Sequence, residues 1–80
     1  MSRHREVFEE FAEKAENRLG DSLKKMILYG SVARGEETQD SDIDVFAVVK
    51  TKEDLDRLRE MAYEIGVLEN AVTINVQGKT

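Results

Sequence analysis

The sequence predicts a small α/β (α+β) domain in which helices pack on a mixed sheet of three strands. Three observations predict this fold class. Two segments carry apolar residues at helical spacing, the run Ile43 to Val49 is rich in β-branched residues, and the order helix, strand, loop or short helix, strand, helix, strand contains no internal repeat. With 80 residues and 40% hydrophobic content, residues 1–80 are expected to form one domain.

The first expected helix covers the charged N-terminal segment. Apolar residues recur at helical spacing from Val7 to Leu19, Ser2 is available as an N-cap, and Gly20 follows the last apolar residue. His4 lies among charged residues at the beginning of this segment. We expect it to be solvated at a frayed terminus rather than catalytic.

Two apolar runs then predict neighbouring strands. The run Met26 to Tyr29 ends at Gly30 and is expected to be a buried strand; for Tyr29, packing in the core is favoured over stacking near a nucleotide base. The run Ile43 to Val49 is apolar on both faces, which predicts a central strand covered on each side. Asp42 and Asp44 stand at the entrance of this second strand.

A second long helix and a third strand complete the expected order. Thr51 followed by Asp54 resembles a capping box, and apolar residues keep one helical face until Gly66. The run 71–76 alternates apolar Val72, Ile74 and Val76 with small or polar residues, which predicts a half-exposed strand. The strand region 71–77 offers polar but no acidic side chains, namely Thr73, Asn75 and Gln77.

Composition excludes several classes of function. The formal net charge is −5 and no stripe of lysine or arginine is present, so direct nucleic-acid binding is not expected. The absence of cysteine excludes disulfides, zinc-thiolate sites and thiol catalysis, and is typical of a reducing cytoplasm. No apolar run approaches the roughly 18 residues of a membrane span. A cytoplasmic protein without a membrane segment is therefore expected.

The paired aspartates predict a cation site. Side chains two apart on a strand project from the same face, about 7 Å apart along the backbone. Asp42 and Asp44 would therefore present two anions together, and such oxygen ligands suit Mg²⁺ or Mn²⁺, which complete their shell with waters and phosphates. Gly30 would let backbone approach a ligand closely, and Ser31 offers a hydroxyl and an amide at the start of a possible short helix. For these groups to meet, the two strands must be antiparallel neighbours.

Arg34 has two interpretations from the sequence. It would help to neutralise phosphates or hold the loop in place, or it would simply pair with one of the acidic residues around it, Glu36, Glu37 or Asp40. A surface ion pair of the second kind carries little energy.

Gly30 and Ser31, ten intervening residues, and then Asp42, Ile43 and Asp44 resemble the signature of the nucleotidyltransferase superfamily with the polymerase-beta-like fold. The stretch Gly-Ser-x-Ala-Arg-Gly, with a serine before the first aspartate, is more narrowly similar to the minimal nucleotidyltransferases. This resemblance covers nearly the whole chain and implies the nucleotidyltransferase fold. It also implies catalytic and metal-binding roles for Asp42 and Asp44, with ATP or another nucleoside triphosphate bound by Gly30, Ser31 and Arg34.

The resemblance further implies an activity and partners. A nucleoside monophosphate, with AMP expected, would be transferred from the triphosphate to a hydroxyl with release of pyrophosphate, and Mg²⁺ or Mn²⁺ would assist. Many minimal nucleotidyltransferases are encoded beside a HEPN protein, as the antitoxin of a toxin–antitoxin pair, and some transfer AMP to a tyrosine of the toxin. A partner protein is therefore an expected acceptor.

Two departures from the family pattern keep an alternative open. Active members commonly use a third carboxylate from a later strand, which the region 71–77 lacks. The alternative is a catalytically impaired interaction module or antitoxin with the same fold. Relatives often continue into a further helix that would cover the sheet, whereas this sequence stops at Thr80. We therefore expect exposed apolar surface and association as a homodimer or with a helical partner. The nucleotide domain of a larger antibiotic-modifying enzyme is a weaker possibility.

Overall fold

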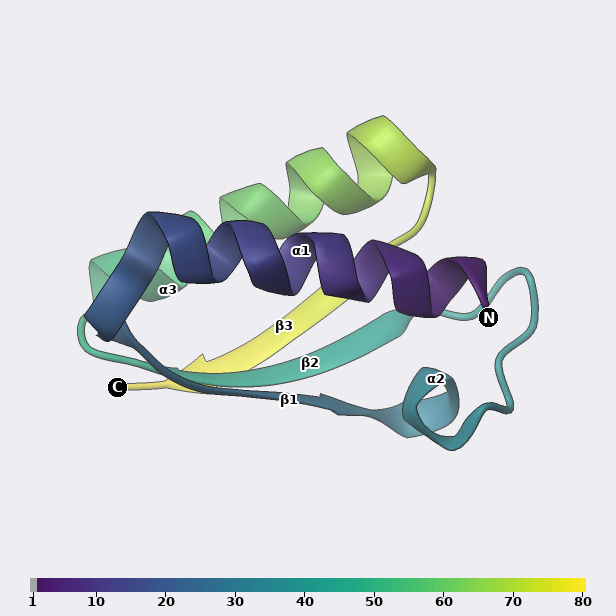
Figure 1. Cartoon of the computed structure of the whole chain (residues 1–80), viewed down its shortest axis with the longest axis horizontal. Coiled ribbons are helices and arrows are strands. Elements are labelled where there is room, and N and C mark those ends of the chain that lie inside the picture. Colours follow the sequence, from purple (N-terminus) through teal and green to yellow (C-terminus); the bar gives the residue numbers. More distant parts are fainter. Residues whose placement is uncertain (1) are drawn as a thin grey trace.

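A computed structural model describes residues 2–80 of the chain. Its elements are α1 (Arg3–Leu19), η1 (Gly20–Ser22), β1 (Leu23–Tyr29), α2 (Gly30–Arg34), β2 (Ile43–Val49), α3 (Lys52–Ala62), the π-helical η2 (Tyr63–Leu68) and β3 (Ile74–Lys79). Helices α1 and α3 lie together on one face of the sheet, and α2 lies at the end of β1 (Figure 1). The predicted α/β class and element order are confirmed.

The described strands form a mixed sheet in the order β1-β2-β3. Strand β2 is antiparallel to β1 and parallel to β3. The register pairs Tyr29 with Asp44 and Asp44 with Asn75, so these three residues lie side by side across the sheet. The predicted antiparallel pairing of the first two strands is confirmed, and it brings the turn after β1 to the entrance of β2.

The hydrophobic core lies between the sheet and the two long helices. Ile43, Val45 and Ala47 of β2 are fully buried, and so are Phe11 of α1 and Leu58 of α3. Isoleucine, valine, phenylalanine and leucine side chains each contribute roughly 1.5–3 kcal/mol when fully buried. The inward face of β2 therefore fixes the position of the strand that carries the aspartates.

The opposite face of the sheet is not covered by any element of residues 2–80 (Figure 1). Phe46 and Val48 of β2 are half-buried there, while Ile27 and Tyr29 of β1 are 41% and 40% exposed. The prediction of a central strand is confirmed, but the prediction that it is covered on each side is wrong, as is the prediction of core packing for Tyr29. Both long helices pack on one face, because α1 leads into β1 from that face and α3 connects β2 to β3 across it (Figure 1).

Strand β1 also differs from the prediction. It begins at Leu23 rather than Met26, and it is a half-exposed edge strand rather than a buried one. Lys24 and Lys25 belong to it and face solvent. Lysines are common on edge strands of natural sheets, where they oppose edge-to-edge association. The strand can therefore include these two lysines although they lie outside its apolar run.

The helix ends follow the sequence signals closely. The Ser2 hydroxyl accepts a hydrogen bond from the Arg5 amide at 3.0 Å, and the Thr51 hydroxyl accepts one from the Asp54 amide at 3.1 Å. Both are N-caps of the expected kind. The second helix continues as η2 to Leu68, past the expected end at Gly66. A Cβ on Gly66 would lie 2.5 Å from the carbonyl oxygen of Val72, so this glycine permits close packing and does not end the helix.

Strand β3 begins later than predicted, at Ile74 rather than Ala71. Ala71 has a φ of 55°, in the left-handed region, and the Val72 amide donates to the carbonyl of Gly66 at 3.0 Å. Residues 71–73 therefore form the approach to the strand. The predicted alternation holds within β3, where Ile74 and Val76 are buried and their neighbours Asn75 and Gln77 are exposed.

No helix within residues 2–80 is long and apolar enough to cross a membrane.

Candidate functional site

The Gly30 turn lies directly against Asp44. Pairing of Tyr29 with Asp44 places the residue after Tyr29 beside the carboxylate, and Gly30 adopts a φ of 77° there. An ideal Cβ on Gly30 would lie 2.5 Å from Oδ2 of Asp44. Only glycine combines this left-handed backbone with such a close approach. The structure thus brings together the Gly-Ser turn and the strand entrance, which are far apart in sequence.

Asp42 and Asp44 converge on the side chain of Asn75. The Nδ2 of Asn75 donates to Oδ2 of Asp42 at 3.2 Å and to Oδ1 of Asp44 at 3.4 Å. One amide group bridges two carboxylates because the parallel register places β3 alongside the entrance of β2. The two carboxylates therefore face the same small volume. The side-chain donor of Asn75 offsets part of their mutual repulsion.

Ser31 lies in the first turn of the short helix α2 and is half-buried. The next residue, Val32, is completely buried and anchors this helix in the core. Gly35 closes the helix in the left-handed conformation, with its amide bonded back to the carbonyl of Val32 at 3.2 Å. The position of Ser31, directly after Gly30, is therefore set by the packing of Val32 and by the glycine-capped turn at the end of α2.

Arg34 forms an ion pair with Glu36. Its Nε lies 2.7 Å from Oε1 of Glu36, and the two side chains are 62% and 65% exposed. Of the two interpretations of Arg34 from the sequence, the structure displays the surface pair. An exposed pair of this kind contributes at most about 1 kcal/mol, so it leaves the guanidinium free to exchange partners.

His4 is buried, so the prediction that it is solvated is wrong. It is only 6% exposed, and its Nε2 lies 2.9 Å from the carbonyl oxygen of Ser41, the residue before Asp42. From Ser2 onward the segment is not frayed, because α1 begins at Arg3 and its first turn packs against the loop between α2 and β2 (Figure 1). A signal was present in the sequence: His4 lies three and seven residues before Val7 and Phe11, on the buried face of the helix.

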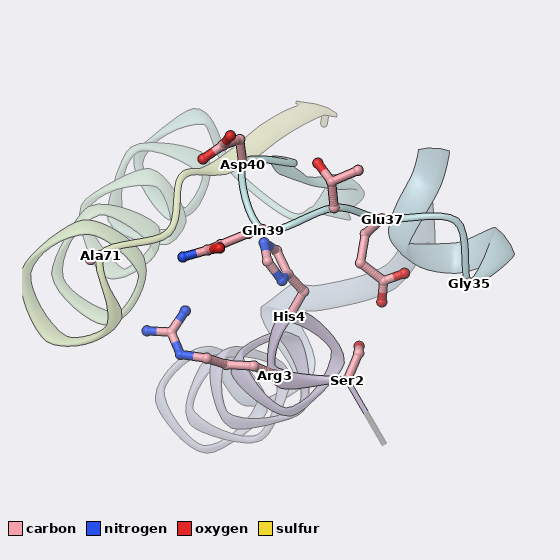
Figure 2. Close-up of a pocket in the computed structure, with 9 residues that line it drawn as sticks. Ser2, Arg3, His4, Gly35, Glu37, Gln39, Asp40 and Ala71 are labelled. Atoms are coloured by element: carbon pink, nitrogen blue, oxygen red, sulfur yellow. The ribbon is translucent and has the colours of Figure 1, made fainter.

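An open groove of about 810 Å³ lies between the start of α1, the loop after α2 and Ala71 (Figure 2). Glu37 lines it, and a hydrogen bond with the Ser2 side chain lowers the pKa of that carboxyl, helped by the charges of His4 and Arg5. Neither Asp42 nor Asp44 lines this groove. The two carboxylates that meet the glycine turn therefore lie outside the groove.

The donor set at the aspartates fits a hard divalent cation. Carboxylate oxygens are the ligands that Mg²⁺ prefers, and one or two carboxylates per ion are usual when phosphates and waters supply the rest. Within residues 2–80, no group of three or more histidine or acidic side chains is placed to hold a metal. Asp42 and Asp44 would therefore bind an ion together with its phosphate ligand rather than as a closed protein cage.

The chain belongs to the nucleotidyltransferase family. The family model described as a nucleotidyltransferase domain matches residues 4–77, nearly the whole chain. This match confirms the resemblance found in the sequence to minimal nucleotidyltransferases of the polymerase-beta-like superfamily. It supports nucleotidyl transfer as the general chemistry of the family.

Three similar curated proteins come from Methanocaldococcus jannaschii, and each is named "Putative protein adenylyltransferase". One is 36% identical over 63 residues, which is 72% of this chain and 43% of that protein. The second is 34% identical over 68 residues, 82% of this chain and 68% of that protein. The third is 42% identical over 45 residues, 56% and 46% respectively. The chain thus spans about half to two thirds of these relatives, and no solved structure matches it.

Proposed function

We propose that this chain binds a nucleoside triphosphate, with ATP as the expected one, together with Mg²⁺ or Mn²⁺. It transfers the nucleoside monophosphate to a hydroxyl group of a protein and releases pyrophosphate. The observation that carries the proposal is the convergence of Asp42 and Asp44 beside Gly30, where a Cβ would collide with a carboxylate oxygen. The names of the three relatives support AMP as the transferred group and protein as the acceptor.

Each residue of the site has a role in this proposal. Asp42 and Asp44 would hold the metal and act as the catalytic residues, and Gly30 leaves space for the phosphates beside them. Ser31 would bind phosphate through its hydroxyl and amide, and Arg34 would add positive charge after leaving Glu36. When bound, the metal would supply neutralisation of phosphate charge and activation of the acceptor hydroxyl. No protein nucleophile is needed, so the chain contributes positioning and electrostatics.

The acceptor in this proposal is a protein partner in the cytoplasm, with a HEPN-type toxin as the first candidate and the chain as its antitoxin. The uncovered face of the sheet supports a protein partner or a homodimer. It presents Ile27, Tyr29 and Phe46 in the same face as Asp44, so an apolar surface adjoins the carboxylates. Exposed apolar residues gathered on one face of a small domain favour association.

Transfer of label from ATP tests the proposal. The chain is incubated with ATP labelled in the α-phosphate, Mg²⁺ and each candidate acceptor protein. We expect metal-dependent labelling that falls at least 100-fold in Asp42→Asn and Asp44→Asn. Asp40→Asn is the matched control, because Asp40 is an exposed carboxylate of the same loop. Labelling that survives in both aspartate variants would contradict the assignment of the site.

A second candidate function is favoured by Asn75. The residue of β3 beside the aspartates is an amide rather than a carboxylate, and its Nδ2 faces both of them. An amide neither balances metal charge nor accepts a proton as a carboxylate does. A binding module without transfer activity would keep complex formation and neutralisation of its partner in Asp42→Asn and Asp44→Asn. Loss of neutralisation in these folded variants would reject that second function.

A further inference from the structure

The first turn of α1 donates hydrogen bonds to backbone carbonyls of three segments around the candidate site. Arg3 donates to the carbonyl of Asn70 in the turn before β3, and His4 bonds to that of Ser41. Arg5 donates to the carbonyls of Val32 and Ala33 at 3.2 and 3.3 Å, at the end of α2. Figure 2 shows the His4 ring directed from α1 toward the loop that carries Gln39 and Asp40, and Arg3 directed toward Ala71. One helical turn therefore links the segments that supply the site.

The contact of His4 fixes the peptide group that leads into Asp42. A carbonyl oxygen can only accept, so the Nε2 of His4 carries the hydrogen of this 2.9 Å bond. The carbonyl of Ser41 and the amide of Asp42 belong to the same rigid peptide plane. Holding the carbonyl thus holds the amide of Asp42 as well. Because the imidazole is buried, the bond is shielded from competition by water.

Asp42 depends on such an anchor more than Asp44 does. Asp44 lies within β2, where the ladder pairs it with Tyr29 on one side and Asn75 on the other. Asp42 precedes the strand, and the nearest backbone bond of the sheet is that of the next residue, from the Ile43 amide to the carbonyl of Thr73 at 2.9 Å. The turn before it is closed by bonds between Thr38 and Ser41, including the Ser41 amide to the Thr38 carbonyl at 3.1 Å. Among these contacts, only the His4 bond ties the turn to the helical layer.

We propose that His4 is a positioning residue for Asp42. By binding the Ser41 carbonyl, His4 holds the carboxylate of Asp42 in its position next to the carboxylate of Asp44. The inference rests on the proposed function, because its consequence is the affinity of the aspartate pair for a divalent ion. His4 touches neither carboxylate and takes no part in the chemistry.

Replacement of the donor separates this role from packing. His4→Leu keeps a side chain of similar bulk in the buried position and removes the hydrogen bond. His4→Gln keeps an N–H donor at a reach close to that of Nε2. Leu19→Ala is the matched control, because Leu19 is equally buried in the same helix but at its far end. It lowers stability through a cavity and leaves the Ser41 contact in place.

The experiment measures Mn²⁺ binding by electron paramagnetic resonance in the presence of a non-hydrolysable ATP analogue, with thermal unfolding recorded for each variant. We expect His4→Leu to weaken Mn²⁺ binding about tenfold, His4→Gln to remain within about threefold of the unmodified chain, and Leu19→Ala to bind normally despite a lower melting temperature. Equal Mn²⁺ affinity in folded His4→Leu, or an equal loss in Leu19→Ala, overturns the inference. If His4→Leu does not fold, His4→Asn, whose donor is too short to reach, replaces it.

The backbone amide of Asp42 gives a second readout that does not depend on metal. In ¹H–¹⁵N spectra of the metal-free chain, His4→Leu should shift this resonance and speed its hydrogen exchange, and His4→Gln should restore both. An unchanged Asp42 amide in His4→Leu overturns the positioning role. If the unmodified chain binds no Mn²⁺, the proposed function fails, while this amide readout still decides the role of His4.

Discussion

Gly30 and Asp44 approach so closely that a single added carbon on Gly30 would lie 2.5 Å from the carboxylate oxygen Oδ2. Gly30→Ala should therefore displace the Asp44 side chain in addition to straining a backbone with a φ of 77°. We expect a loss of about 1–3 kcal/mol of stability. Nucleotidyl transfer and Mn²⁺ binding should fall by at least tenfold, measured by label transfer and by electron paramagnetic resonance.

Gly35 provides the matched control for this change. It has a similar φ of 72°, but nothing lies within 4 Å of its ideal Cβ. Gly35→Ala should cost about 1 kcal/mol through backbone strain alone and leave Mn²⁺ affinity intact. If both alanine variants lose Mn²⁺ binding to the same extent, the close approach of Gly30 to Asp44 has no role in the site.

Asn75→Asp tests whether a carboxylate at this position of β3 strengthens metal binding by the two aspartates. The new side chain would face Asp42 and Asp44 at the distance of the present amide, about 3 Å, so three anions would repel one another without a cation. We expect a loss of about 1 kcal/mol of stability in metal-free buffer and Mn²⁺ binding at least tenfold tighter. Isothermal titration and thermal unfolding with and without Mn²⁺ measure both effects. Asn75→Ala, which removes the amide and adds no charge, is the control. An Asn75→Asp variant that binds Mn²⁺ no better than the unmodified chain would contradict the assignment.

Substitutions of Arg34 and of Glu36 should have opposite effects on the KM for ATP. Arg34→Met should raise the KM for ATP several-fold, and Glu36→Gln should lower it, because it frees the guanidinium for phosphate. Stability should change by less than about 0.5 kcal/mol in both variants, since the pair is exposed. Steady-state kinetics of label transfer measure the KM. A KM that is the same in both variants would leave Arg34 with only its surface pair.

Ala71 adopts a left-handed φ of 55° in the turn before β3. Ala71→Gly should relieve this strain and raise stability by about 0.5–1 kcal/mol, which is a few degrees in melting temperature for a domain of this size. Thermal unfolding followed by circular dichroism measures the change. A lower melting temperature would mean that the flexibility gained by the unfolded chain outweighs the strain relieved.

The pH dependence of Glu37 follows from its contact with Ser2. The hydrogen bond from the Ser2 side chain lowers the pKa of Glu37 below its ordinary value. The stabilisation that this brings is present above the ordinary pKa of a glutamate and is lost as pH falls through the lowered value. Ser2→Ala should return the pKa toward its ordinary value, as followed by the carboxyl ¹³C shift of Glu37. An unchanged titration curve would show that Ser2 is not the cause.

Much of the fold could be predicted because its signals are local. The caps at Ser2 and Thr51 mark the starts of α1 and α3. The β-branched run Ile43 to Val49 coincides with β2. The antiparallel pairing followed from the need for the Gly-Ser turn to meet the aspartates. Features that depend on tertiary packing were missed: the coverage of only one face of β2, and the length of the edge strand β1.

In the candidate site, too, residues with a local sequence signal could be predicted and residues placed by tertiary packing could not. The sequence indicated Gly30, Ser31, Asp42 and Asp44 through their spacing, and the structure brings Gly30 against Asp44 and joins the two aspartates through Asn75. His4 was missed because its neighbours in sequence are charged, whereas its partner lies 37 residues away. The contact of Asn75 with both carboxylates required the parallel register of β2 and β3, which no local pattern specifies.

The most direct test of the account is the paramagnetic effect of Mn²⁺ on the amide spectrum of the chain with a non-hydrolysable ATP analogue present. Bound Mn²⁺ should broaden the amides of Gly30, Ser31, Asp42 and Asp44 first, and Asp44→Asn should abolish that selective broadening. Broadening that centres on other acidic segments, or that persists unchanged in Asp44→Asn, would contradict a divalent ion held between the paired aspartates and the glycine turn.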